Sequence, residues 1–200
     1  VPPRSEISPE FPRYLGEVAR RLGRNPHVGR TVTASREDVE NALGELGKKA
    51  DDIMKAAAGR IFVTTAISQN GKLDGLIVLF AQSKLVFDIA RIYYQRPTIR
   101  NLHYLYANVA VMVFFASEVE DMDLTGIVQP ILTGVLGSAA GAIPGFQVAS
   151  MILISSVISG SSNAFLTLRV GAITKQYCRS LVVPTKRTVR RQATLEATKM

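Results

Sequence analysis

The spacing of apolar residues predicts a long amphipathic helix in the first third of the chain. Apolar positions recur at three- and four-residue steps from Val39 to Ala57, and the pattern continues to Ile67. This period is that of an α-helix with one buried face. The string Ser35-Arg36-Glu37-Asp38 predicts the start, because the serine hydroxyl can accept a free N–H of the first turn and acids favour the positive end of a helix.

Two further helices are predicted after this one. The first runs from Leu73 to about Gln95 and ends before Pro97, and the second spans Asn101 to about Ser117. Together these three helices make residues 35–123 an amphipathic helical region. Residues 1–34 hold four prolines near their start, so we expect an extended or loop lead-in with one short helix.

A long uncharged stretch follows the amphipathic region. Leu124 to Leu168 is 45 residues without one ionisable side chain. A transmembrane helix needs about 20 apolar residues to cross the hydrocarbon layer. The stretch is therefore long enough for two crossings, and Pro144 beside Gly145 marks a turn near its middle. We predict a candidate transmembrane helical hairpin over residues 124–168.

Both limbs of this hairpin are rich in small residues. Helices in lipid associate through close backbone approach and interhelical hydrogen bonds, so small faces favour a tight hairpin. The predicted helix-packing residues are Gly134, Gly137, Gly141, Ser155, Ser159 and Ser162. The predicted fold class is all-α: a helical membrane-associated protein with amphipathic helices and a Gly/Ser-rich helical hairpin.

The formal net charge of +8 is concentrated at the C-terminal end of the sequence. Residues 169–200 carry eight Lys or Arg against one acid. A basic tail after an uncharged stretch indicates, by the positive-inside rule, that both termini are cytoplasmic and that the tail lies near anionic lipid headgroups. The residues expected to do this are Arg169, Lys175, Arg179, Lys186, Arg187, Arg190 and Arg191. Tyr177 is the single aromatic residue among them, so nucleic acid is not a predicted partner.

Lys84, Asp88 and Arg91 form a narrow polar stripe on the second predicted helix. Their spacing of four and then three residues places them on one face, where they can pair. Two interpretations stay open. The stripe is either the solvated face of an amphipathic helix, which we favour, or a set of intramembrane charges that marks a transport route.

No recognisable catalytic or metal-binding motif is present. The two histidines, His27 and His103, lie on unrelated elements, and the single cysteine is Cys178, whereas a zinc site needs three or four ligands. The segment from Gly23 to Thr31 departs from a phosphate-binding loop, with five residues between its glycines and Arg in place of Lys. The sequence predicts a protein that is not an enzyme and has no cofactor or metal.

Several strings resemble the bacterial YcjF-type family. They are Thr65-Ala66-Ile67-Ser68, Tyr93-Tyr94-Gln95-Arg96-Pro97 and the run from Asn163 to Gly171. The family is a domain of unknown function in inner-membrane proteins, often fused to or encoded beside a GTPase. The resemblance covers residues of about 40–195 and implies an inner-membrane location and a GTPase partner in trans, but no catalytic residues. Longer members carry a further membrane hairpin upstream, which is absent from these 200 residues.

The sequence therefore predicts a non-catalytic bacterial inner-membrane protein that anchors or regulates a cytoplasmic partner such as a GTPase. Membrane lipid and a second copy of the chain are the other expected partners. Two alternatives remain: a soluble helical protein-interaction module, and a transporter or channel element that uses Lys84, Asp88 and Arg91.

Overall fold

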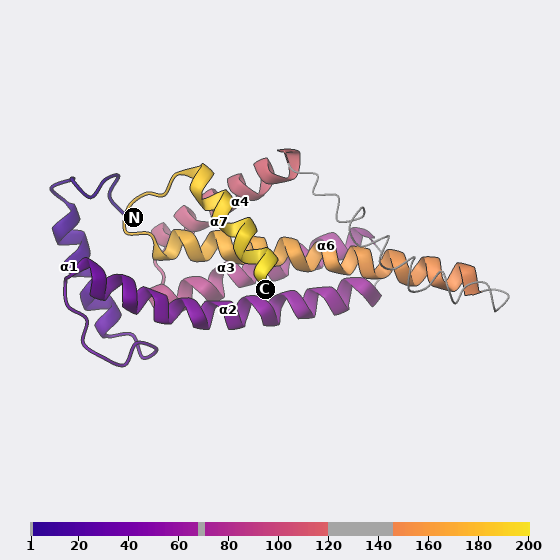
Figure 1. Ribbon diagram of the computed structural model, residues 1–200, viewed down its shortest axis with the longest axis horizontal. Coiled ribbons are helices and arrows are strands. Elements are labelled where there is room, and N and C mark those ends of the chain that lie inside the picture. Colours follow the sequence, from indigo (N-terminus) through magenta and orange to yellow (C-terminus); the bar gives the residue numbers. More distant parts are fainter. Residues whose placement is uncertain (1, 68–70, 120–145) are drawn as a thin grey trace.

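Every regular element that the structure describes is a helix. The computed structural model describes residues 2–67, 71–119 and 146–200, and within them it contains no strand (Figure 1). The helices are α1 (Phe11–Gly23), α2 (Arg36–Ile67), α3 (Gly71–Tyr94), α4 (Ile99–Val119), α6 (Phe146–Arg179) and α7 (Lys186–Lys199). The all-α prediction is confirmed for this part of the chain.

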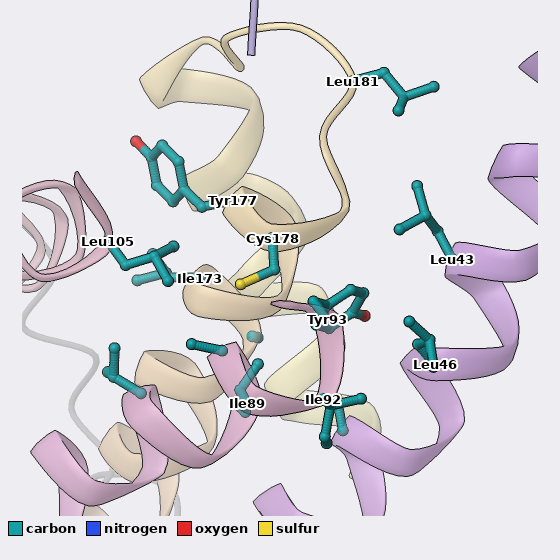
Figure 2. Packing of buried hydrophobic residues seen from close by; sticks show 14 of the residues in the cluster. Leu43, Leu46, Ile89, Ile92, Tyr93, Leu105, Ile173, Tyr177, Cys178 and Leu181 are labelled. Carbon is teal, nitrogen blue, oxygen red and sulfur yellow. The ribbon is translucent and has the colours of Figure 1, made fainter. Parts of the chain in front are cut away.

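The core forms where α2, α3 and α6 run side by side along the long axis of the molecule (Figure 1). α2 packs most extensively against α6, while α4 and α7 both lie against α6 and α1 lies against α2. Ile89 and Tyr93 of α3, Leu46 of α2, Leu105 of α4 and Ile173 of α6 are fully buried and meet in this core (Figure 2). These are the apolar stripes of the amphipathic helices, which gain stability by leaving water.

The start of α2 follows the predicted capping arrangement. The Oγ of Ser35 accepts the N–H of Asp38 at 3.2 Å. The Asp38 carboxylate in turn accepts the N–H of Thr33 at 2.7 Å and its hydroxyl at 2.8 Å, and it pairs with Arg30 at 2.5 Å. These bonds, led by the Thr33 N–H, lower the pKa of Asp38 to about 2. A single carboxylate thus fastens the preceding loop to the first turn.

Asn25 anchors the same loop to the last turn of α3. Its side chain is almost fully buried, and its Nδ2 donates to the carbonyl of Ile92 at 2.7 Å, while its Oδ1 accepts the N–H of His27. At the end of α3, Gln95 has a φ of 57° and its Nε2 donates to the carbonyl of Arg21 at 3.3 Å. Side-chain amides therefore satisfy backbone groups where the chain reverses.

The structure has no break at residue 168, where the sequence analysis places the boundary between a hairpin and a basic tail. α6 runs without interruption from Phe146 to Arg179. Residues 186–199 form α7, which buries Val189, Ala193 and Ala197. The C-terminal segment is folded because its apolar residues repeat at four-residue steps, a period that the count of positive charges obscured. The first limb of the predicted hairpin, through residue 145, lies outside the described residues.

A buried ammonium group joins three helices in the core. Lys175 of α6 has a side chain that is 5 % exposed, and its Nζ lies 2.5 Å from Asp51 Oδ1 of α2. The same Nζ donates to Glu196 Oε1 of α7. A buried charge is tolerated only when it is paired and hydrogen-bonded, and both conditions are met here. This cluster holds α7 on the bundle.

Gly160 marks a close approach of α6 to the backbone of α2. A Cβ at this position would lie 2.9 Å from the carbonyl oxygen of Phe62 and 3.2 Å from the Cβ of Ala66. The backbone oxygen cannot rotate away as a side chain can. The two helices therefore require glycine at this crossing.

We predict that Gly160→Ala lowers the free energy of unfolding by about 1–3 kcal/mol, because overpacking displaces the α2 backbone. Chemical denaturation monitored by circular dichroism measures this change. Gly44→Ala is the matched control, since a Cβ there meets nothing within 4 Å and the change should raise stability by about 0.5–1 kcal/mol. Equal effects of the two substitutions would contradict the close approach.

We predict that the stabilising effect of Asp38 depends on pH. Its pKa falls from 3.8 to about 2 on folding, so its contribution is present above the unfolded value and is lost as the pH falls through about 2. Denaturation of the wild type and Asp38→Asn should differ at neutral pH and converge towards pH 2. A difference that stays constant over this range would exclude the proposed role of the carboxylate.

Candidate functional site

One end of the bundle exposes large apolar side chains to solvent. It lies where α2 ends at Ile67 and α3 begins at Gly71, with three residues between the two helices in sequence. We call this surface the apolar end, and its members are Val63, Ile67, Leu76, Ile77, Leu79 and Phe80. Ile67, Phe80 and Leu76 are 75 %, 74 % and 65 % exposed. Contiguous apolar surface of this kind on a folded protein marks a site of contact with protein or membrane.

Lys72 and Asp74, at the start of α3, are the two charged residues within the sequence of the apolar end. No charged residue occurs between Arg60 and Lys72, or between Asp74 and Lys84. The N-terminal half of α6, which reaches towards the same end and extends beyond α2 and α3, carries no charge before Arg169 (Figure 1). Three helices thus bring their charge-free segments together, whereas α1 and the loops that flank it lie at the opposite end (Figure 1).

The helices of residues 2–67, 71–119 and 146–200 include none that is both long and apolar enough to cross a bilayer. The predicted transmembrane hairpin is therefore not found in its second limb, residues 146–168, which forms part of α6. Serine, glycine and asparagine between Ser155 and Asn163 dilute the apolar character of that limb.

The predicted helix-packing residues are only partly placed. Gly134, Gly137 and Gly141 lie outside the described residues. Ser155 belongs to α6, Ser159 is exposed and Ser162 is half-buried. The small residue that makes the close contact is their neighbour Gly160. The run Ser159-Gly160-Ser161-Ser162 was the signal that could have identified it.

The stripe of Lys84, Asp88 and Arg91 lies on the outside of α3. Lys84 Nζ pairs with Asp88 Oδ2 at 2.5 Å, and the Lys84 side chain is 61 % exposed. Arg91 is exposed and its guanidinium lies 5.9 Å from the ring centroid of Phe87. Asp88 and Arg91 also border an open hollow of about 370 Å³ beside His27. In this arrangement Lys84 and Arg91 are exposed to solvent and Asp88 is half-buried.

The basic residues of the C-terminal segment divide into two groups. Arg169 and Lys175 are buried, and Lys175 is paired with Asp51 inside the core. Arg190 is half-buried. The remaining predicted residues are exposed: Arg179, Lys186, Arg187 and Arg191. Composition alone could not separate these groups, because burial depends on which side of α6 and α7 each residue occupies.

Metal-ligating and nucleophilic side chains are dispersed or buried in the described residues. These residues contain no group of three or more His, Cys, Asp or Glu side chains that could hold a metal ion. Cys178 is buried, and desolvation raises the pKa of its thiol, which disfavours the nucleophilic thiolate. Burial likewise raises the pKa of Tyr104 to about 12.

The sequence matches one family over most of its length. The model of the family described as "Domain of unknown function (DUF697)" covers residues 33–198. No curated protein and no solved structure matches the chain. The match includes all of α2, α3, α4, α6 and nearly all of α7, so it covers the whole bundle apart from α1 and the lead-in. The chain therefore belongs to the family of the domain of unknown function DUF697.

Proposed function

We propose that the protein is a non-catalytic, membrane-associated helical protein that inserts its apolar end into one leaflet. It holds a cytoplasmic partner at its charged end, which is the opposite end of the bundle, where α1 and the loops that flank it lie (Figure 1). The observation that carries the proposal is the exposure of Leu76, Leu79 and Phe80 in a segment of α3, residues 75–83, that contains no charged residue. Exposed apolar side chains at the tip of a helical pair gain free energy by entering hydrocarbon.

The length of the uncharged segments supports insertion into a single leaflet. From Arg60 to Ile67 α2 extends about 10 Å, and from Gly75 to Lys84 α3 extends about 14 Å, at 1.5 Å per residue. One leaflet contributes about 15 Å of hydrocarbon, half of the ~30 Å total. Arg60 and Lys84 are both exposed, and at this depth their charged groups reach the headgroups.

The membrane we propose is the bacterial inner membrane, with the charged end in the cytoplasm. Exposed Arg179, Lys186, Arg187 and Arg191 supply positive charge on the part of the bundle away from the apolar end. Lys and Arg accumulate on the cytoplasmic side of membrane proteins, which supports this orientation.

The partner we propose is a GTPase supplied in trans. Support comes from the resemblance of the chain to inner-membrane proteins associated with GTPases. Exposed Arg20 and Arg24 at the end of α1 belong to the charged end, where a soluble partner would find access unobstructed by lipid.

We expect the full chain to sediment with vesicles of phosphatidylcholine and phosphatidylglycerol, and the triple variant Leu76→Ser/Leu79→Ser/Phe80→Ser to lose this binding. Burial of one large apolar side chain contributes about 1.5–3 kcal/mol, so the partition coefficient should fall by at least about a hundredfold. Circular dichroism verifies that the variant is folded.

Ile7→Ser/Ile99→Ser is the matched control for vesicle binding. These side chains are 94 % and 87 % exposed but lie before α1 and at the start of α4, away from the apolar end. Their replacement should leave sedimentation unchanged. A wild type that stays in the supernatant refutes insertion. If it also self-associates through the same three residues, the soluble interaction module is the better description.

For the partner, we expect the membrane-extracted full chain to capture a GTPase in a nucleotide-dependent manner. Pull-downs with a non-hydrolysable GTP analogue or GDP, read by mass spectrometry, measure this. Arg20→Glu/Arg24→Glu should reduce capture, whereas Lys48→Glu/Lys49→Glu, on exposed positions of α2, should not. Absence of a GTPase with either nucleotide removes this part of the proposal.

A further inference from the structure

A mostly apolar groove lies between α2 and α6 beside the apolar end. It encloses about 380 Å³, within the usual size of ligand pockets. Its lining includes Lys55, Gly59 and Phe62 from α2 and Ala164, Phe165 and Leu168 from α6. A Cβ added to Gly59 would meet nothing within 4 Å, so the groove is open at this glycine.

The groove leads into the apolar end. Phe62 precedes Val63, and the crossing of Gly160 on the Phe62 carbonyl brings α6 against the last turns of α2. Phe165 is followed by Leu166, which is 39 % exposed. The groove and the apolar end therefore adjoin each other along the last turns of α2.

Lys55 supplies a positive charge at the end of the groove that is farther from the apolar end. It is exposed and forms no ion pair with any of the described residues, whereas Lys84 and Lys175 are both paired. Seven residues separate Lys55 from Phe62, a distance of about 10 Å along the helix. A cation at one end of an apolar groove complements an amphiphile with an anionic head and a hydrocarbon tail.

We propose that this groove binds one anionic phospholipid, with its phosphate at Lys55 and an acyl chain along Gly59, Phe62 and Ala164 towards the apolar end. The inference rests on the proposed function, because the lipid is drawn from the leaflet that the apolar end enters. Lys55 lies about 18 Å from Ile67 along α2, which places it at the level of the headgroups.

The test uses phosphatidylglycerol with a diazirine in its acyl chain, mixed as a trace probe into phosphatidylcholine vesicles or uncharged detergent micelles with the full chain. After irradiation, peptide mapping should locate adducts on α2 and on residues 161–168 of α6. One basic residue near the surface favours an anionic head about fivefold, so the same probe with a choline head should label correspondingly less.

Two variants with matched controls test the groove itself. Gly59→Leu should fill the groove and lower the labelling of residues 161–168 by at least about tenfold, whereas Gly44→Leu, which adds the same side chain at another open glycine of α2, should not. Lys55→Met should remove the headgroup preference, and Lys48→Met on the same helix should keep it.

The micelle arm separates this inference from the proposed function. Labelling in micelles by a chain that fails to sediment with vesicles supports the groove and refutes membrane insertion. Unchanged labelling of Gly59→Leu overturns the groove while vesicle binding stands. Displacement of the probe by oleate as readily as by unlabelled phosphatidylglycerol overturns the phospholipid in favour of a free fatty acid.

Discussion

The contact between α2 and α6 is the interaction on which the rest of the structure depends. It is the most extensive helix pair, and α3, α4 and α7 all pack on α6. Two different constraints fix it: the absence of a side chain at Gly160 and the paired ammonium of Lys175. The first sets how closely the helices approach, and the second sets their register through a charge that is costly to bury alone.

This framework separates the surface of the protein into two regions of different character. The bundle helices are amphipathic near the core residues of Figure 2 but lose their charges towards the apolar end. Loops held by Asn25 and Asp38 occupy the other end. The two ends favour surroundings of different polarity, so the molecule has a preferred orientation at a boundary between water and an apolar phase. The family match shows to which family the chain belongs but gives no activity. The proposed function therefore rests on the exposed surfaces of the bundle.

Helix positions were largely predictable, and the roles of charged residues were not. Apolar periodicity and the capping string located α2 closely, and Pro97 marked the end of α3. Gly160 and Lys175 escaped prediction because their significance depends on a partner more than 90 residues away, Phe62 or Asp51. The apolar end was likewise hidden: periodicity shows that α3 is apolar, but not which of its side chains remain uncovered.

The long sequence separation within the core has a consequence for biosynthesis. Asp51 and Lys175 are 124 residues apart. At ribosomal rates of about 5–20 residues per second, α2 emerges roughly 6–25 s before the helix that covers it. During this interval its apolar stripe has no native cover, and transiently exposed apolar surface of this kind favours aggregation until α6 is available to close the bundle.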